Sequence, residues 1–566
     1  MKRDVEFLKS ADLSFDCIVI GGGIQGAGIA REASLQGLKV LLVDRGDFAS
    51  GTSSRSTKLI HGGLRYLEQG NFKLVKESLA ERKVLMRMAP HLVRPLPFLF
   101  PVYQGDRRGL WQIRLGLKIY DALAKENKIQ PHENWAKDSI LKSFPEMSPK
   151  KLAGGLVYWD AQMDDSRLCL EVLKSAFKLG CHVMNYMRVT GFVKTGEKIS
   201  SVQLKDLKTG EIYEIQGKIF INATGIRADE IRQMAEPDAK KRLRWSKGVH
   251  LVTKRLFAPE SASSQPLAIV RPTSDGRIFF VLPWVRGTTL IGTTDTDYAN
   301  KPSECYSQKE DVEYLYKEFQ TLFPSLRLKR NDFYVTFSGL RALINNSSKK
   351  ATSALSREYE IEELGSGLLS ILGGKYTTFR SLSVKVVEKV FKILNLERRY
   401  DDTRYLSLDG SFLEDEVLAK KRIDYERRSQ SYGLSPEARE HLWSTYGTNV
   451  VEIFKLLDYD PTLKSEILPE RFPHFPIKAE IVYAIKDEMS LTLTDFLRRR
   501  SQLFFSVGGG LDVLDSVALV YQDYLHWSDE EIEKQKQDYR QEVARNTKAL
   551  DQVFVSQNHS EARSRR

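Results

Sequence analysis

The first clear pattern of apolar and polar positions lies near the start of the chain. An apolar run over 16–20 precedes a glycine-rich turn, and small residues with helical spacing continue to Ala33. A second apolar run over 39–43 ends at Asp44. Short apolar runs separated by a glycine turn and a helical segment are typical of a strand, helix, strand unit. The pattern therefore predicts a βαβ unit here.

Further along, the pattern changes near residue 400. Before this point several apolar runs are strand-like: 218–221, 278–282 and 368–372. After it, segments with helical spacing are rich in charge: 414–428 and 479–500. We place a domain boundary near Asp402 and expect a helical domain over 402–555. The polar tail 556–566 is expected to be disordered.

Composition then narrows the class of protein. The 566 residues are 42% hydrophobic and 28% charged, which excludes a disordered or collagen-like chain. The length suggests about three or four domains. The four cysteines form no C-x-x-C pair and lack zinc-finger spacing. We therefore expect no disulfide framework and no bound metal.

The formal charge of +12 leaves several partners open. A positive surplus suits nucleic acid, an anionic membrane or an anionic substrate, or serves nothing beyond solubility. The first fourteen residues lack the apolar core of a signal peptide, and no run approaches the roughly 18 apolar residues of a membrane span. We expect a chain that has no evident export signal and does not span a bilayer.

The glycine turn has the spacing of a dinucleotide-binding fingerprint, Gly21-x-Gly23-x-x-Gly26. In such a turn the first glycine allows the tight bend, the second lets backbone N–H groups approach a pyrophosphate, and the third allows close helix packing. Asp44 would accept hydrogen bonds from the adenosine ribose. The fingerprint does not separate FAD from NAD. The absence of a second such motif and the polar segment 52–63 favour FAD.

Later motifs resemble those of the FAD-dependent glycerol-3-phosphate dehydrogenases. The resemblance begins with Ser-Ser-x-Ser-Thr-Lys-Leu-Ile-His-Gly-Gly-Leu-Arg-Tyr-Leu over 53–67 and continues in order to about Arg500. The other matching segments are 88–92, 164–168, 222–225, 247–250, 291–295, 338–341 and 373–378. Two features differ. Asp44 stands where the family more often has Glu, and the stretch between Arg341 and Arg357 lacks the long insertion of the glycerol-phosphate oxidases, which favours a dehydrogenase.

The resemblance implies an α/β (α+β) flavoprotein of the glycine oxidase type. It would contain a Rossmann-type FAD-binding domain, a mixed-sheet substrate domain and a C-terminal helical cap domain. The first two would be interleaved within residues 1–401. The FAD-binding segments would be about 14–90, 150–235 and 335–400, and the substrate segments about 91–149 and 236–334.

The implied reaction is oxidation of sn-glycerol 3-phosphate to dihydroxyacetone phosphate by hydride transfer to FAD. Lys375 and nearby backbone N–H groups would stabilise the reduced flavin ring. The residues expected to bind the cofactor are Gly21, Gly23, Gly26, Asp44, Thr52, Ser53, Ser56, Thr57, Lys58, Leu59, His61, Ala223, Gly225, Gly374, Lys375 and Thr377.

The substrate phosphate requires cations, and the planar guanidinium of arginine donates paired hydrogen bonds to phosphate oxygens. The resemblance points to Arg65 and Arg341. His250 is the candidate base for the C2 hydroxyl proton, because its ordinary pKa lies near neutrality, and His61 is a competitor. The expected substrate-binding residues are Arg65, Tyr66, His250, Thr293, Arg341 and Arg357, and the expected catalytic residues are His250, Arg341 and Lys375.

Residues 110–125 predict a two-faced helix. One narrow face carries Arg114, Lys118, Asp121 and Lys125. The other carries Trp111, Ile113, Leu115, Ile119, Tyr120 and Leu123. This pattern suits either an interfacial membrane helix or a helix that covers the protein's own core. With the family resemblance, we expect a cytoplasmic protein that associates peripherally with the inner face of the cell membrane.

Three functions remain in view. The first is a peripheral dehydrogenase that passes electrons from glycerol 3-phosphate to membrane quinone. The second is a soluble oxidase that produces hydrogen peroxide, and the third is a non-enzymatic dinucleotide- or nucleic-acid-binding protein. No run of interleaved aromatic and basic residues supports nucleic-acid binding. The expected partners are glycerol 3-phosphate, membrane quinone and an anionic membrane surface, with a homodimer left open and nucleic acid not expected.

Overall fold

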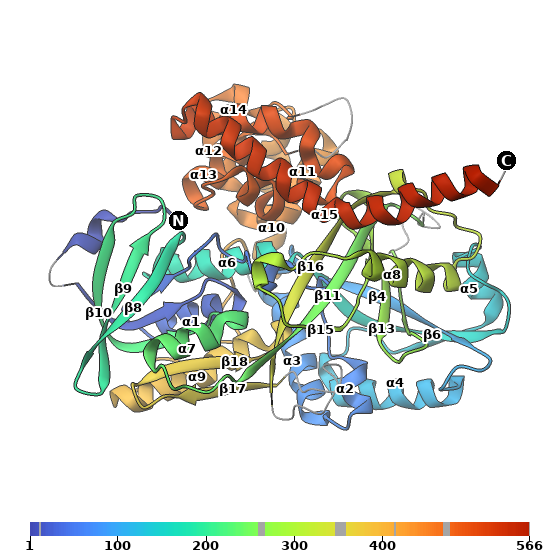
Figure 1. Ribbon diagram of the computed structural model, residues 1–566, viewed down its shortest axis with the longest axis horizontal. Helices are drawn as coiled ribbons and strands as arrows, with labels where there is room; N and C mark the ends of the chain where they lie inside the picture. Colours follow the sequence, from blue (N-terminus) through green and yellow to red (C-terminus); the bar gives the residue numbers. More distant parts are fainter. Residues whose placement is uncertain (11–12, 258–265, 346–357, 412–414, 468–475, 565–566) are drawn as a thin grey trace.

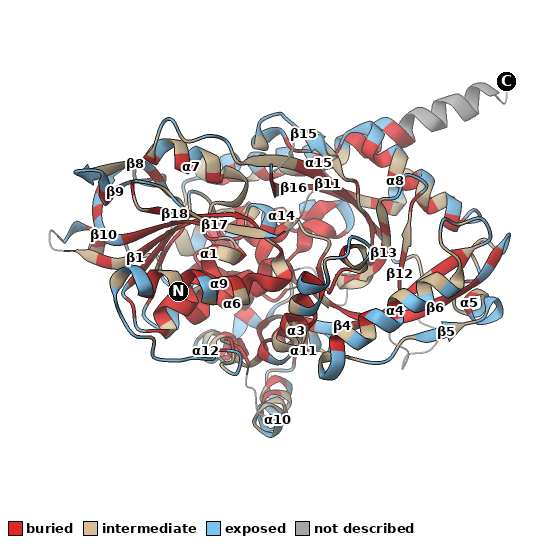
Figure 2. Cartoon of the chain, turned by 90° about the horizontal axis from the view of Figure 1, so that it is seen from below, coloured by how far each residue is buried: buried red, intermediate tan, exposed pale blue. Residues whose placement is uncertain are grey.

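The computed structural model describes residues 1–10, 13–257, 266–345, 358–411, 415–467 and 476–564. These residues form two sheets that lie side by side, with a group of helices from the C-terminal part of the chain above them (Figure 1). Buried residues are concentrated in the sheets and in the helices between them, whereas α10 (Asp415–Ser431) projects from the body (Figure 2).

The first sheet contains the predicted βαβ unit. Strand β1 (Ser14–Ile20) pairs in parallel with β2 (Val40–Val43), and α1 (Ile24–Leu35) connects them, which confirms that prediction. The strand order is β17-β18-β10-β1-β2-β7, and a hairpin of β8 and β9 extends β10. The remaining strands are β7 (His182–Met184), β8 (Met187–Thr195), β9 (Lys198–Asp206), β10 (Ile212–Asn222), β17 (Tyr359–Glu363) and β18 (Leu368–Gly373).

Helices cover both faces of this sheet. Successive side chains of a strand point to opposite faces, so Cys17 and Val19 pack in one cluster and Ile18 and Ile20 in another. The first cluster includes α1, α6 (Asp165–Lys178) and α9 (Phe379–Leu394). The second includes α7 (Ala228–Ala235). A mainly parallel sheet with both faces buried explains why its strands read as continuous apolar runs.

The second sheet is mixed and has the order β15-β11-β14-β13-β12-β4-β6-β3, with β16 on β11 and β5 on β6. Among the described strands, β4 and β12 form its parallel pair. The bounds are β3 (Leu59–Ile60), β4 (Val93–Tyr103), β5 (Glu133–Trp135), β6 (Leu152–Met163), β11 (Leu243–Lys254), β12 (Ala268–Pro272), β13 (Ile278–Trp284), β14 (Thr288–Gly292), β15 (Thr296–Tyr298) and β16 (Phe333–Ile344).

The segment boundaries expected from the sequence differ from this pairing in three places. Strands β3, β6 and β16 fall within segments expected to build the FAD-binding domain. All three lie in the second sheet, because β3 pairs with β6, β6 pairs with β4, and β16 pairs along the length of β11. The chain therefore crosses between the two sheets more often than the motif order suggests.

Helices also flank the second sheet. On one side lie α2 (Leu64–Glu68), α3 (Phe72–Met88) and α4 (Leu110–Ala124). On the other side lie α5 (Lys137–Ser143), α8 (Lys309–Leu322) and part of α15 (Asp529–Ser564). Figure 1 shows α15 running from the upper helices across this half of the molecule toward the C-terminus.

Helix α4 is present as predicted, but its apolar and charged side chains are not distributed around it as predicted. The inward apolar side chains are Leu117, Tyr120 and Ala124. The outward apolar side chains are Trp111, Leu115 and Ile119, which are 69%, 51% and 37% exposed. Arg114 and Lys118 are also exposed. The predicted division into one basic and one apolar face is wrong, because one apolar strip packs on the protein's own core while a second remains outside beside the cations.

The C-terminal helices also differ from their pattern at one place. The helical spacing over 479–500 corresponds to α13 (Lys478–Asp487) and a separate π-helical segment, Asp495–Arg500. The break occurs because Met489 has a left-handed conformation and the Asp495 carboxylate accepts the N–H groups of Leu491 and Thr492. The other helices are α11 (Pro436–Tyr446), α12 (Val450–Tyr459) and α14 (Leu514–Leu525).

Helix α15 continues to Ser564, into the tail that was expected to be disordered, and residues 565–566 lie outside the described part. None of the helices in the described ranges combines the length and the apolar character that crossing a bilayer requires. All four cysteines are free and buried.

Candidate functional site

A cavity of about 910 Å³ is lined by residues of both sheets. One end of its lining is the glycine turn with Asp44, and another part contains His250 and Arg341. Every predicted site residue that the structure describes lines this cavity, except Gly26 and Lys58. Arg357 lies outside the described residues. The structure thus brings together motifs that are up to about 350 positions apart in the sequence.

The glycine turn has no room for a side chain at Gly21 or Gly26. Gly21 has φ +114, and a Cβ atom there would lie 2.6 Å from the carbonyl oxygen of Ala223. A Cβ atom on Gly26 would lie 1.8 Å from the oxygen of Gly21. Gly26 therefore acts behind the cavity, where it lets α1 approach the turn. This geometry fits the close approach of a pyrophosphate to the start of a helix.

Asp44 lies at the end of β2, beside the turn. Its carboxylate accepts the N–H of Gly22 at 2.6 Å and the N–H of Gly46 at 2.8 Å. Burial raises the pKa of Asp44 to about 6, although these two hydrogen bonds oppose the shift. A partly exposed carboxylate at the cavity edge, whose two oxygens each accept one backbone N–H and can accept a further hydrogen bond, suits the two ribose hydroxyls that would donate to it.

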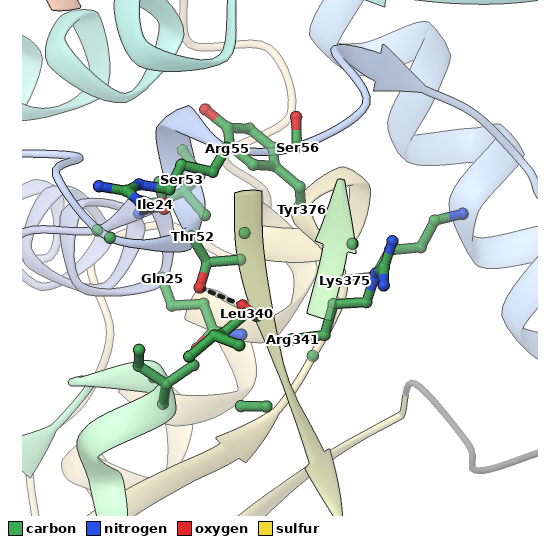
Figure 3. Close-up of a pocket in the computed structure, with 18 of the residues that line it drawn as sticks. Ile24, Gln25, Thr52, Ser53, Arg55, Ser56, Leu340, Arg341, Lys375 and Tyr376 are labelled. Atoms are coloured by element: carbon green, nitrogen blue, oxygen red, sulfur yellow. Dashed lines mark hydrogen bonds between the residues drawn. The ribbon is translucent and has the colours of Figure 1, made fainter. Parts of the chain in front are cut away.

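The hydroxyl-rich segment 52–57 ties the turn to the second sheet. Thr52 Oγ1 donates to the carbonyl oxygen of Leu340 on β16 at 2.7 Å, the dashed line in Figure 3. The N–H of Ile24, at the start of α1, donates to Ser53 Oγ at 2.9 Å. Thr57 Oγ1 lies 3.1 Å from His250 Nε2. The segment therefore connects the cofactor end of the cavity with the end that holds His250.

Lys58 supports this segment from behind. Its ammonium group is buried, donates to the Ser54 carbonyl oxygen at 2.8 Å and pairs with Asp165 at 2.5 Å. Ser56 Oγ donates to the other oxygen of Asp165 at 2.7 Å. Asp165 belongs to the motif 164–168, to which the sequence assigned no task. The structure gives it one, since this carboxylate fixes the Ser56–Lys58 turn.

Lys375 follows the glycine pair that ends β18. Its Nζ atom donates to the carbonyl oxygens of His61 and Gly62, the second at 3.2 Å. The N–H of Gly62 donates to Tyr120 Oη at 2.9 Å. The loop before α2 is thus held on both its N–H and its carbonyl sides. Since this loop leads into Arg65, Lys375 contributes to the placement of that guanidinium group.

Arg65 and Arg341 converge on one carboxylate. Asp295 Oδ2 lies 3.6 Å from Arg65 Nη1, and Asp295 Oδ1 lies 3.7 Å from Arg341 Nη1. Arg341 Nη2 also donates to Thr293 Oγ1 at 3.2 Å. Two guanidinium groups with ten N–H donors between them can surround a phosphate better than separate lysines.

His250 lies on β11, close enough to Arg341 to interact with its charge. It is 2% exposed, and its Nδ1 atom has no hydrogen-bond partner among the described residues. Burial, followed by the positive charges of Arg341 and Lys58, holds the pKa of His250 well below its ordinary value. The imidazole is therefore neutral near pH 7 and able to accept a proton.

Three strand glycines make room for these groups, and the sequence reasoning missed them. A Cβ atom on Gly248 would lie 2.2 Å from Arg341 Nη2, and one on Gly292 would lie 2.2 Å from His250 Cδ2. On Gly339 it would lie 2.6 Å from the carbonyl oxygen of Arg55. Glycine inside a strand often marks such a close approach, so the signal was present in the sequence.

Other lining residues were also missed. Arg55 occupies the unspecified position of the Ser-Ser-x-Ser motif and lines the cavity. An apolar wall on the side of the second sheet contains Phe98, Phe100, Val270, Ile278 and Phe280. In sequence these apolar residues are indistinguishable from core positions, since alternate residues of any half-buried strand look alike.

Two family models match the chain. One, described as FAD dependent oxidoreductase, matches residues 16–379, and one, described as the C-terminal domain of alpha-glycerophosphate oxidase, matches residues 401–532. The mitochondrial glycerol-3-phosphate dehydrogenase of Macaca fascicularis is 36% identical over 557 residues, which cover 94% of this chain and 74% of the relative. The aerobic glycerol-3-phosphate dehydrogenase of Staphylococcus epidermidis is 35% identical over 553 residues, which cover 96% of each.

Solved structures show the same architecture. The glycerol-3-phosphate dehydrogenase from Bacillus halodurans complexed with FAD has a TM-score of 0.76 and 28% identity, covering 95% of this chain and 96% of its own. The glycine oxidase of Geobacillus kaustophilus has a TM-score of 0.52 and 16% identity, covering 69% and 97%. The second likeness concerns the fold alone. Together they confirm the predicted fold class, a glycine oxidase type flavoprotein fold with an added helical domain.

Proposed function

This chain belongs to the family of the FAD-dependent glycerol-3-phosphate dehydrogenases, within the FAD-dependent oxidoreductases, and on this premise we propose that it oxidises sn-glycerol 3-phosphate to dihydroxyacetone phosphate and passes the electrons to membrane quinone. The family and the cofactor expected from the motifs are confirmed, and the cofactor is FAD. Bound FAD supplies the two-electron acceptor for the oxidation.

The single observation that carries the substrate assignment is the convergence of Arg65 and Arg341 on Asp295 beside a neutral His250. The arginines would bind the substrate phosphate, and Asp295 would hold both guanidinium groups in place. His250 would accept the proton of the C2 hydroxyl, because removal of that proton must accompany oxidation of the carbon. Phosphate binding and proton removal act on one small substrate, so they require arginine and histidine side chains that lie close together in the cavity.

Around the cofactor, the chain's own groups have separate tasks in the proposal. The turn Gly21–Gly26 would hold the pyrophosphate, and Asp44 the adenosine ribose. The Gly373–Thr377 segment precedes α9, so its N–H groups would face the flavin ring, while Lys375 braces the loop that carries Arg65. The Ser56–Lys58 turn, fixed by Asp165, would close the cavity over the cofactor.

Peripheral membrane association at the inner, cytoplasmic face of the cell membrane forms part of the proposal. Its support is α4, on which Trp111, Leu115 and Ile119 face outward next to Arg114 and Lys118. Apolar side chains can insert between lipids while neighbouring cations contact anionic headgroups. This mixture on one surface favours lipid over nucleic acid as the partner of the basic surplus.

The second candidate is an oxidase that reduces oxygen to hydrogen peroxide with the same substrate. The description of the matched C-terminal family model refers to such an oxidase, which is the observation in its favour. The absence of a long insertion between Arg341 and Arg357 favours the dehydrogenase.

The test is anaerobic mixing of the purified holoprotein with glycerol 3-phosphate while the flavin absorbance is followed. We expect bleaching with glycerol 3-phosphate at concentrations at which glycerol has no effect. An unchanged spectrum would remove the proposed activity and leave a binding protein. The bleached protein is then divided between a soluble quinone analogue and air-saturated buffer. Faster re-oxidation by quinone supports the dehydrogenase, whereas fast re-oxidation by oxygen with stoichiometric peroxide makes the chain an oxidase.

A further inference from the structure

The charged segment Asp495–Arg500 has no task in the proposed reaction, yet all six of its residues are buried. Charged side chains are rarely buried without a specific partner. The partner of two of its arginines lies more than 450 positions earlier, in the loop that follows β2. This contact joins the C-terminal helices to the FAD-binding sheet.

The loop partner is Asp47, which is 2% exposed. Arg500 Nη1 donates to Asp47 Oδ2 at 2.6 Å and Arg500 Nη2 donates to Oδ1 at 2.8 Å, a bidentate pair. Arg499 Nε donates to the same carboxylate. Burial alone would raise the pKa of Asp47, but Arg500 and Arg499 outweigh it and hold that pKa below its ordinary value.

Asp47 lies three residues after Asp44, the predicted ribose acceptor, and outside the cavity lining. Asp44 and Gly46 line the cavity. The loop is also packed against the glycine turn, because the N–H of Ala49 donates to the oxygen of Gly22 at 3.0 Å. The position of the Asp44 carboxylate is therefore set by a loop whose rear side is held by C-terminal arginines.

A second connection runs from the same segment to the same loop. Arg499 Nη2 donates to Asp495 Oδ1 at 2.6 Å, and Tyr186 Oη donates to that oxygen at 2.8 Å. The N–H of Tyr186 donates to the carbonyl oxygen of Gly46 at 3.1 Å. The loop is thus attached through both a side chain and the backbone, and the two attachments meet at Arg499.

We propose that Arg500, together with Arg499, is a positioning residue for the adenosine-ribose loop, so that the C-terminal helical domain controls how tightly FAD is retained. The inference rests on FAD as the cofactor and not on the identity of the substrate. If the contacts of Arg499 and Arg500 strengthen FAD binding by holding the loop, bound FAD must stabilise those contacts by the same free energy, because such coupling is reciprocal.

The chain offers a matched control in the same segment. Arg498 is also buried, but it pairs with Glu542 of α15 instead of Asp47. Arg500→Lys and Arg498→Lys therefore make the same chemical change two residues apart, and each keeps the charge while losing the planar fork.

The experiment titrates deflavinated full-length protein with FAD and follows quenching of flavin fluorescence. We expect Arg500→Lys to raise the Kd for FAD by about tenfold or more, and Arg498→Lys to change it by less than about twofold. ADP, which contains the ribose but no flavin, should lose affinity by a similar factor in Arg500→Lys. Equal weakening by both variants, an unchanged Kd in Arg500→Lys, or a loss for FAD without a loss for ADP would each overturn the proposal.

A measurement on the wild-type chain tests the same coupling if Arg500→Lys does not fold. Hydrogen exchange is compared between the apoprotein and the protein with FAD. FAD should protect residues 488–500 more strongly than α12, which belongs to the same helical domain but does not contact the loop. Equal protection of both segments, or none at 488–500, would contradict the proposal.

Discussion

The imidazole of His250 lies flat on the ring of Phe337, with ring centroids 4.7 Å apart and planes inclined by 8°. The two residues are direct antiparallel neighbours on β11 and β16. Phe337 therefore excludes water from one face of the imidazole, while Gly292 leaves room on the next strand. This contact contributes to the burial that keeps His250 neutral, and it leads to the first prediction.

His250→Asn should lower kcat by about 10²- to 10⁴-fold, the usual effect of removing a general base. FAD content and the flavin spectrum should remain those of the wild type, because His250 is predicted to contact the substrate. His526→Asn is the control, since His526 is exposed, remote from the cavity and in a left-handed conformation that Asn tolerates. Similar kcat values for both variants would exclude His250 as the base.

The lowered pKa of His250 also has a pH consequence. A histidine whose pKa is depressed stays unprotonated as the pH falls below the ordinary value of 6.5, and loses its basic form only below the depressed pKa. We expect kcat at saturating substrate to change by less than about twofold between pH 7.5 and 6. A decrease that follows a pKa near 6.5 and disappears in His250→Asn would show that the imidazole is not shielded as described.

Arg341→Ala should raise the KM for glycerol 3-phosphate by about 10- to 150-fold, the effect of losing one or more hydrogen bonds to a charged group. The rate with glycerol at high concentration should change little, because glycerol has no phosphate. Arg244→Ala, on the same sheet and paired with Asp297, is the matched control. If both substrates are affected equally, Arg341 does not bind the phosphate.

Asp44 gives FAD binding a pH dependence. In the apoprotein its pKa is about 6, so the carboxylate form that accepts ribose hydroxyls is lost as the pH falls through 6. The Kd for FAD should therefore rise about tenfold for each pH unit well below 6, and Asp44→Asn should bind weakly with no such dependence. The stability of the apoprotein should respond with the opposite sign, decreasing as the pH rises from the ordinary Asp value of 3.8 towards 6. Asp16→Asn, outside the cavity, serves as control.

Leu115→Glu should abolish most binding to vesicles that contain anionic phosphatidylglycerol, because it places a charge in the outward apolar strip of α4. Ile212→Glu is the control, as Ile212 is 67% exposed on β10 and belongs to the other sheet. Both variants should retain activity with a soluble electron acceptor. Co-sedimentation at increasing salt measures the effect, and equal binding of the two variants would assign membrane contact to a surface other than α4.

The βαβ unit and its cofactor could be predicted because their physical requirements are local. Gly21 must have a positive φ, and Asp44 must follow the second strand, so both leave a signal within about 25 residues of sequence. The arginines that we propose as phosphate ligands were identified through motifs and not through physics. Nothing in the spacing of Arg65 and Arg341 reveals that they meet at Asp295.

The features that sequence reasoning did not reach depend on partners remote in the chain. Lys58 looked like a cofactor contact, but its ammonium group is buried against Asp165, and neither residue alone indicates this pair. The outward strip of α4 was misassigned because apolar residues occur around most of that helix. In both cases the side of an element that becomes buried depends on a neighbour that periodicity does not specify.

The pairing of Asp47 with Arg499 and Arg500 also orders events during synthesis of the chain. The carboxylate leaves the ribosome 452 and 453 residues before its two partners, and α15 comes later still. The last residue that lines the cavity is Thr377, so the nucleotide pocket gains all of its own residues before the arginines that hold its ribose loop have been made. On the proposed role of these arginines, FAD binds at full affinity only after the C-terminal helical domain has been synthesised.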